Sequence, residues 1–398
     1  MRLRKPEGCE CTDPRTGARV RQVTSHASMH HHPFYYLPCM DDAMTRLFFI
    51  SHRTGRAEVW CEIRATGELQ QLTDQPDIGE WSVHPSHDGR YVYYTAGQGA
   101  WRVATATGEA EQLLDFGGLA GREAGMVGAA MGTTTLSHDD RYWAVPVKLG
   151  PRFRFIVIDT ATGAHETILE AATIGHPEFH PHDNTLLRYA GSYKERIWVI
   201  NRDGSGNRLV YDRKPLAVPG QFEWIVHETW NPGEIVESRG GMVDGGGLRG
   251  EGVQPEDGKL RRREIITANW PRGCIGIDVD TGAVRAVCGF NAWHPSINRQ
   301  GTLMCADTVF PDIGLQVFDP RDGVGAPRTL CLPAASSEGA HWNTDHCPYD
   351  DADYQAGKWT VYAPQHTHPH PAFAPDGRSV VFTSDRTGVA QVYEVVLP

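Results

Sequence analysis

Imidazole and amide side chains gather in one short stretch near the end of the chain. Three histidines and a glutamine fall within six residues: Gln365, His366, His368 and His370. Neutral imidazole is the commonest metal ligand in proteins near neutral pH. Because alternate residues of an extended chain point the same way, His368 and His370 could face one ion, and the prolines on either side of His370 disfavour a helix here. The stretch therefore indicates either a metal site or a polar loop with surface histidines.

A repeated hairpin pattern predicts which elements position these side chains. The clearest copies, Trp81–Thr95 and His370–Ser384, each read as a strand, an Asp-Gly turn and a second strand. Weaker copies of the pattern are Tyr35–Ile50, Thr133–Val147, His176–Ala190, His227–Glu237 and His294–Thr308. A third strand, a turn and a short fourth strand tend to follow each hairpin, as in Ala57–Ile63 and Leu69–Thr73. Four strands per unit at this period are typical of a β-propeller.

The seven units predict an all-β fold, a seven-bladed β-propeller that occupies residues 1–398 as a single domain. The last unit runs out of chain after its third strand, Ala390–Leu397, whereas Val20–Thr24 looks like the fourth strand Leu69–Thr73. We therefore expect the N-terminal strand to complete the last blade and close the ring. Residues 1–18 are expected to form a flexible segment. The glycine-rich stretch 239–263 is expected to be a loop inserted in the fifth blade, either a lid or a disordered excursion.

Four histidines share one phase of the repeat. His370, His294 and His176 each lie seven residues before the hairpin turn, and His227 lies six residues before it. Equivalent positions in a propeller are related by rotation about the central axis, so these side chains should converge on one mouth of the channel. The alternative is that the repeat favours His-Pro at strand starts for turn reasons, as His84-Pro85 suggests.

The convergence predicts a metal-binding set made of three imidazoles and one amide oxygen: His294, His368, His370 and Gln365. This set leaves coordination positions open for water or a substrate oxygen, as catalysis requires. Imidazole suits zinc, iron or nickel, and the amide oxygen also permits manganese, so the ligands alone do not choose the ion.

Two further residues could do chemistry beside such a metal. His227 is a candidate general base because it lies near the metal set but outside it, the alternative being a core histidine. Arg196 begins a predicted strand and could clamp a carboxylate through its planar guanidinium. The alternative for Arg196 is a surface ion pair.

Composition excludes several classes of function. A formal net charge of −11 argues against general nucleic-acid binding, so a polyanionic substrate would need a local basic patch. We find no hydrophobic run near 18 residues and no apolar region after the basic start, and therefore expect neither a membrane span nor a signal peptide. Nine cysteines without a CxxC pair indicate reduced thiols in a cytoplasmic protein.

From about residue 20 to its end, the chain resembles the oligogalacturonate lyase family of seven-bladed propellers that degrade pectin fragments. The motifs that carry the resemblance are Gln365-x-x-His368-x-His370-Pro-x-Phe-x-Pro-Asp-Gly377, His294 seven residues before Gly301, His227-Glu-x-Trp230 and Arg196-Ile-Trp198. The resemblance implies that His294, His368, His370 and Gln365 bind manganese, that His227 is the base and that Arg196 handles substrate charge. The stretch Met29–Tyr36 keeps a histidine near His31 although its neighbours differ, and His31 and His176 are candidate substrate-binding residues.

The activity that this resemblance implies is metal-dependent β-elimination of short oligogalacturonides or related uronic-acid oligosaccharides. The metal would hold the uronate carboxylate, His227 would take the C5 proton and Arg196 would add positive charge before the C4–O bond breaks. The alternatives are a non-catalytic Tol-like propeller that binds protein partners and a metal-dependent hydrolase. A prolyl-oligopeptidase-type hydrolase is disfavoured because the chain is too short for a second catalytic domain and contains no Gly-x-Ser-x-Gly motif.

Overall fold

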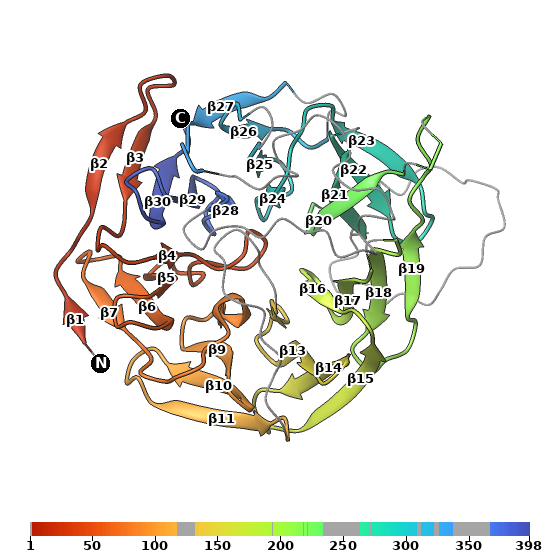
Figure 1. Cartoon of the computed structure of the whole chain (residues 1–398), viewed down its shortest axis with the longest axis horizontal. Coiled ribbons are helices and arrows are strands. Elements are labelled where there is room, and N and C mark those ends of the chain that lie inside the picture. The colour runs from red at the N-terminus through yellow and green to blue at the C-terminus, as the bar shows by residue number, and fades with distance from the viewer. Residues whose placement is uncertain are drawn as a thin grey trace, which may run out of the picture.

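Seven antiparallel sheets surround a central axis as the blades of a propeller (Figure 1). The computed structural model describes residues 2–117, 132–192, 194–217, 219–220, 222–233, 263–270, 273–308, 312–321, 326–336 and 367–398. The predicted all-β, seven-bladed β-propeller is confirmed. Within these ranges, the elements are strands apart from one 3-10 turn, Glu80–Ser82, and no helix has the length and apolar character needed to cross a membrane.

Each blade has four strands in order outward from the channel, and a fifth strand joins the outer edge of the first and the last blade. The first three blades are β4 (His30–His31), β5 (Arg46–Ser51), β6 (Glu58–Ile63) and β7 (Leu69–Gln71); β8 (His84–Pro85), β9 (Tyr91–Ala96), β10 (Gly99–Ala104) and β11 (Ala110–Asp115); and β12 (Thr135–Leu136), β13 (Tyr142–Leu149), β14 (Arg152–Asp159) and β15 (His165–Ala171). The next three are β16 (Gly175–His180), β17 (Asp183–Ala190), β18 (Ile197–Asn201) and β19 (Arg208–Tyr211); β20 (Trp224–Asn231), β21 (Glu264–Trp270), β22 (Gly273–Asp278) and β23 (Val284–Cys288); and β24 (Ser296–Ile297), β25 (Met304–Ala306), β26 (Leu315–Phe318) and β27 (Arg328–Cys331). The seventh is β28 (Ala372–Phe373), β29 (Ser379–Ser384), β30 (Gln391–Val396) and β3 (Arg19–Gln22).

Apolar side chains of neighbouring blades pack against one another and hold the ring together. Between the first and second blades, Phe48 and Val59 of one sheet share a buried cluster with Val92 and Tyr94 of the next. A sheet must bury its hydrophobic faces against another element, and here each blade finds that element in its neighbours. The inner strands are therefore fixed at the channel wall, where the candidate residues lie.

The N-terminal part of the chain closes the ring. β3 pairs with β30 through Val20 and Val395, so the expectation that this strand completes the last blade is confirmed. The flexible segment expected over residues 1–18 is corrected, because β1 (Leu3–Arg4) pairs with β7 and β2 (Cys9–Thr12) pairs with β3. The physical reason is that the outermost strand of a sheet leaves a row of unpaired backbone groups that a further strand can use.

The fifth blade departs from the hairpin expected over His227–Glu237. β20 pairs instead with β21, with Asn231 opposite Glu264, so a long connection separates the first and second strands. The expected insertion 239–263 lies, apart from Arg263, outside the described residues. The prediction placed the hairpin turn at Gly233 and was wrong. Closing a long loop costs only slightly more entropy than closing a short one, so two strands can pair across a long insertion.

Four charged side chains clasp the first blade to the last. Arg21 contacts Glu62 at 2.5 Å and Glu394 at 2.9 Å, and Arg64 contacts the same two carboxylates at 3.0 and 2.8 Å. The side chains of Glu62 and Glu394 are only 3% and 7% exposed. These ion pairs join the last blade to the first, at the place where the ring closes, and they therefore hold the ring closed.

We expect Glu394→Gln to lower the free energy of unfolding by about 2–3 kcal/mol, because a nearly buried charge pair loses one partner while its arginines stay partly solvated. Burial raises the pKa of Glu394, but Arg64 and Arg21 outweigh burial and lower it overall. Its contribution is therefore present above the ordinary carboxyl pKa and is lost as the pH falls through the lowered value. Urea unfolding at pH 7 and at pH 3 measures both effects.

The matched control is Glu10→Gln, which breaks an ion pair with Arg19 whose side chains are 58% and 71% exposed. This variant should change the unfolding free energy by less than about 0.5 kcal/mol. Equal stability of the Glu10 and Glu394 variants would show that the clasp does not stabilise the ring.

Candidate functional site

Three of the four predicted metal ligands come together at the channel. The side chains of His294, His368 and His370 are buried, and their ligand atoms all lie within 4.8 Å of one another. His294 and His370 stand two residues before the inner strands β24 and β28 of neighbouring blades, and their ring centroids are 4.2 Å apart. This geometry can hold a single ion. Gln365, the predicted fourth ligand, lies outside the described residues, as does His366.

Asp307, which the sequence reasoning missed, orients this histidine cluster. Its fully buried carboxylate lies 2.7 and 2.9 Å from Nδ1 of His294, and it also accepts hydrogen bonds from the backbone N–H groups of His294 and His370 at 2.8 and 3.2 Å. When Nδ1–H donates to a carboxylate, the Nε2 lone pair remains available to a metal. The only sequence signal for Asp307 was its place in the hairpin that follows His294.

Burial keeps His370 in the form that binds metal. The pKa of His370 is lowered well below its ordinary value, first by burial and then by the neighbouring imidazoles of His294 and His368. The imidazole of His370 is therefore neutral at pH 7 and offers a lone pair rather than a charge. Three buried imidazoles with a carboxylate behind one of them fit a divalent cation that accepts nitrogen ligands.

Three of the phased histidines have a strained backbone. His176, His227 and His370 have φ angles of +46°, +58° and +48°, in the left-handed region that L residues seldom adopt. His176 and His227 also lie where the pairing register shifts, within β16 and β20. A bulge of this kind re-aims a side chain, and strained residues cluster at functional sites. The local backbone therefore turns the imidazoles of His176 and His227 out of the regular ladder.

His227 reaches the cluster from the neighbouring fifth blade. Its ring centroid lies 4.1 Å from that of His294, and its side chain also contacts Trp293 at 5.1 Å. Burial, followed by the charges of His294 and His176, lowers its pKa well below the ordinary value. His227 is thus a neutral imidazole beside the cluster, in the state that a proton acceptor requires.

Arg196 joins the site through a buried ion pair. Its Nε donates to Oε1 of Glu228 at 2.6 Å, and its Nη2 donates to Nδ1 of His176 at 3.2 Å. The Glu228 side chain is 1% exposed and that of Arg196 is 18% exposed, so this is not the surface pair considered as the alternative. Burial raises the pKa of Glu228, but Arg196 outweighs it and the net shift is downward. Glu228 therefore remains a carboxylate that fixes the guanidinium.

His31 lies one layer away from the cluster. Its Nδ1 contacts the carbonyl of His32 at 3.1 Å, and its Nε2 contacts Oε2 of Glu80 at 3.1 Å. The ring of Trp81 separates His31 from the cluster, with centroids 4.3 Å from His31 and 5.6 Å from His370. Of the two predicted substrate-binding residues, the structure therefore brings His176 into the site and leaves His31 behind Trp81.

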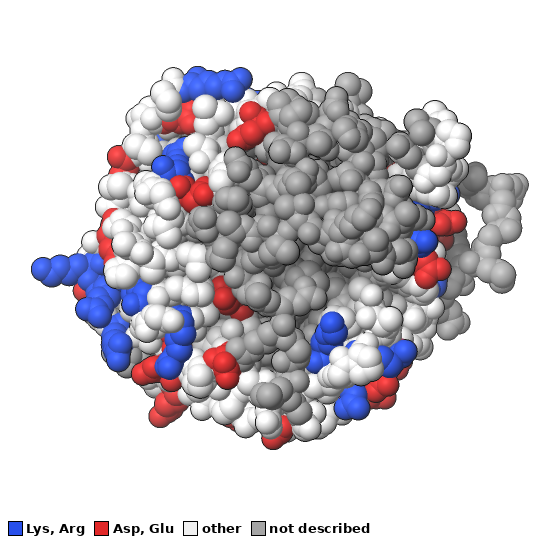
Figure 2. Space-filling model, viewed as in Figure 1, with Lys and Arg blue, Asp and Glu red and all other residues white. Residues whose placement is uncertain are grey.

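Side chains of both charge signs are mixed over the described part of the face drawn in Figure 2, where Lys and Arg lie beside Asp and Glu. This mixture gives no broad single-sign field in the described residues on this face. An acidic ligand would therefore depend on individual cations near the cluster, of which Arg196 is one.

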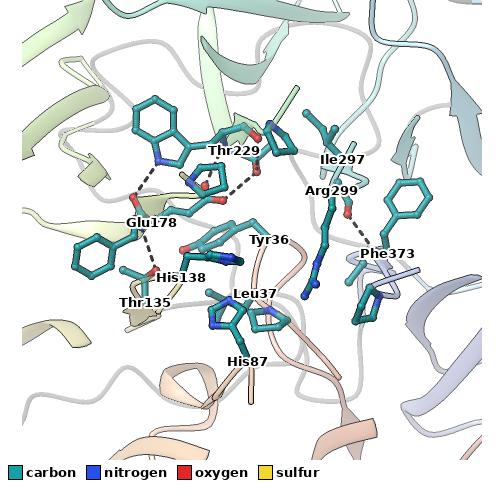
Figure 3. A pocket seen from close by; sticks show the side chains of 18 of the residues that line it. Tyr36, Leu37, His87, Thr135, His138, Glu178, Thr229, Ile297, Arg299 and Phe373 are labelled. Atoms are coloured by element: carbon teal, nitrogen blue, oxygen red, sulfur yellow. Dashed lines mark hydrogen bonds between the residues drawn. The ribbon is translucent and has the colours of Figure 1, made fainter. Parts of the chain in front are cut away.

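A cavity of about 220 Å³ opens at the opposite end of the inner strands (Figure 3). Its lining includes Trp230, Ile297 and Phe373, each of which follows one of the phased histidines by three residues. Pro232 also lines the cavity. The described part of the chain that leads to the insertion 239–263 therefore leaves the blade at the cavity end of the channel. The described residues therefore give no support to that insertion as a lid over the histidines.

No family model matches the chain. Two curated relatives are similar to it in sequence. An oligogalacturonide lyase of Pectobacterium atrosepticum is 26% identical over 62% of this chain and 56% of the relative, so the match spans little more than half of that protein. An oligogalacturonate lyase of Dickeya dadantii is 24% identical over 97% of this chain and 95% of the relative.

Two solved structures share the fold over the whole chain. An oligogalacturonate lyase in complex with manganese has a TM-score of 0.74 and 22% identity, covering 100% of this chain and 98% of that one. An oligogalacturonate lyase of Vibrio parahaemolyticus has a TM-score of 0.71 and 20% identity, with the same coverage. The similarity to oligogalacturonate lyases that the motifs indicated is thereby confirmed.

Proposed function

We propose that this chain is a metal-dependent lyase that cleaves short oligogalacturonides, or related uronic-acid oligosaccharides, by β-elimination to unsaturated products. The observation that carries the proposal is the convergence of His294, His368 and His370, with the neutral imidazole of His227 beside them and Arg196 fixed nearby. The names of the relatives support the substrate class, and the manganese in the similar solved structure supports Mn²⁺ as the cofactor.

The proposed ligands are His294, His368 and His370, with Gln365 as a fourth from outside the described residues. A divalent cation held there would supply positive charge to the substrate carboxylate and so make the adjacent C5–H bond more acidic. The chain prepares this site in advance, because Asp307 sets the tautomer of His294 and burial keeps His370 neutral.

The remaining residues carry the elimination. His227 takes the C5 proton on its neutral ring, the C5–H electron pair becomes the C4=C5 double bond, and the C4–O bond breaks with its electron pair on the departing oxygen. Arg196 places its guanidinium against the carboxylate or that oxygen, and Glu228 holds the guanidinium in position. His176 assists by accepting from Arg196, and we keep both His176 and His31 as proposed substrate-binding residues.

The reaction type is tested by the products. With short oligogalacturonides and Mn²⁺, ultraviolet absorbance should rise as a C4=C5 double bond conjugated to the carboxylate forms. In heavy-oxygen water, mass spectrometry should find one dehydrated unsaturated uronide and no heavy oxygen introduced at the cleaved bond. Incorporation of heavy oxygen during cleavage would instead establish a metal-dependent hydrolase, which activates water.

We also place the protein in the cytoplasm. All eight described cysteines are free thiols, and six of them are buried, which supports a reducing compartment. An acidic oligosaccharide is the partner that the proposed activity requires.

A further inference from the structure

The inner strand of the first blade leaves its ladder and crosses the channel. His31 pairs with Ile50, and pairing resumes only where Met40 meets Leu47. Between these two pairs, eight residues of the inner strand, 32–39, stand opposite only two residues of β5, 48–49. We call residues 32–39 the channel plug. The plug is buried except for Tyr36 and Pro38, which are half-buried.

The plug packs beneath imidazoles from four other blades. The ring of Phe34 lies 5.0 Å from His176 and 5.0 Å from His370. The ring of Tyr35 lies 6.3 Å from His227 and 5.6 Å from His294. Two consecutive aromatic residues of the first blade therefore touch side chains of the fourth, fifth and sixth blades and the histidine that leads into the seventh.

The plug also holds the backbone at two strained histidines. Nε2–H of His32 donates to the carbonyl of His370 at 2.7 Å, while Nδ1 of His32 accepts from the hydroxyl of Thr383 at 2.8 Å. The hydroxyl of Tyr35 donates to the carbonyl of Glu228, the residue after His227, at 2.7 Å. Since His227 and His370 both have positive φ, each relies on surrounding contacts to keep that conformation.

We propose that the plug positions the site, with His32 fixing the metal ligand His370 and Tyr35 fixing the base His227. The inference rests on the proposed function for the roles of these two histidines. It assigns separate effects to the two plug residues: His32 acts on metal affinity and Tyr35 acts on proton transfer. A plug that merely stabilised the fold would affect both properties together.

The first test compares two hydroxyl deletions side by side in the plug. Tyr35→Phe should lower kcat about three- to tenfold, with the dissociation constant for Mn²⁺ changed less than twofold. The loss is partial because Arg188 also donates to the Glu228 carbonyl. Tyr36→Phe is the matched control: it removes a hydrogen bond to Thr133, 3.0 Å away in the third blade, and should leave kcat and metal affinity unchanged.

The second test needs no substrate. Calorimetric titration of the full chain with MnCl₂ should show about ten- to a hundredfold weaker binding for His32→Leu, as expected when a residue that supports a ligand is lost. His32→Gln, which retains an N–H donor, should recover most of the affinity. If His32→Leu does not fold, Thr383→Val, which removes the hydroxyl that sets the His32 tautomer, should weaken Mn²⁺ binding to a smaller extent.

Melting temperatures separate positioning from stability. The proposal is overturned if metal affinity and kcat are unchanged in all variants, or if both fall together in proportion to the melting temperature. A wild-type chain that binds Mn²⁺ yet forms no unsaturated product would refute the proposed lyase activity, while the metal titration of the His32 variants would still decide the role of that residue.

Discussion

Alanine in place of His294 or His370 should remove most of the bound metal and most of the activity while the propeller stays folded. With three imidazoles inside a 4.8 Å cluster, the loss of one takes away a large share of the coordination. The ring should survive because each blade packs on its neighbours, and buried clusters such as that of Phe48 and Val92 are untouched. Elemental analysis of the purified variants measures the metal, and circular dichroism reports the fold.

The two variants should differ in stability. His294→Ala leaves the buried carboxylate of Asp307 without its main partner, which costs about 1–3 kcal/mol. His370→Ala loses a backbone-strained imidazole but keeps the Asp307–His294 pair. Asp307→Asn should weaken metal binding about ten- to a hundredfold with all three imidazoles present, because the amide no longer demands Nδ1–H from His294.

His182→Ala is the control for these metal-site variants. His182 is an exposed histidine that lines the cavity at the opposite mouth, and it is not part of the cluster. Its replacement should leave metal content and activity at wild-type values. Full metal occupancy in both the His294 and His370 variants would disprove the ligand assignment.

His227→Ala should retain metal and bind substrate while kcat falls about a hundredfold to ten-thousandfold, the usual contribution of a general base. The imidazole is buried beside His294 and is neutral because burial lowers its pKa, so its loss removes the proton acceptor without removing a proposed ligand. Steady-state kinetics, together with metal analysis of the same samples, separates these two roles.

The backbone at His227 calls for a second variant. Its φ of +58° is unfavourable for alanine, whereas asparagine tolerates this region better. His227→Asn should therefore keep the local fold, measured by its melting temperature, and still lose kcat to a similar extent. A near-normal kcat in both variants would return His227 to a structural role beside Trp293.

The repeat pattern was sufficient to predict the seven blades, the closure by β3 and the convergence of the phased histidines. Strand periodicity and hairpin turns are local signals, and rotational symmetry converts a shared phase into a shared place in the fold. This is why His294 and His370, 76 positions apart in the sequence, could be placed together from their distance to a turn. The roles of Gln365 and of the insertion 239–263 stay predictions, because they fall outside the described residues, except for Arg263.

Only the tertiary structure decided which groups surround the histidines. Asp307 contacts His370 from another blade, Glu228 pairs with Arg196 32 residues away, and Tyr35 reaches Glu228 across 193 residues. Such contacts have no local signal, since they depend on how complete blades pack. The left-handed backbone at His176, His227 and His370 was equally hidden, because a non-glycine residue adopts positive φ only where its surroundings impose it.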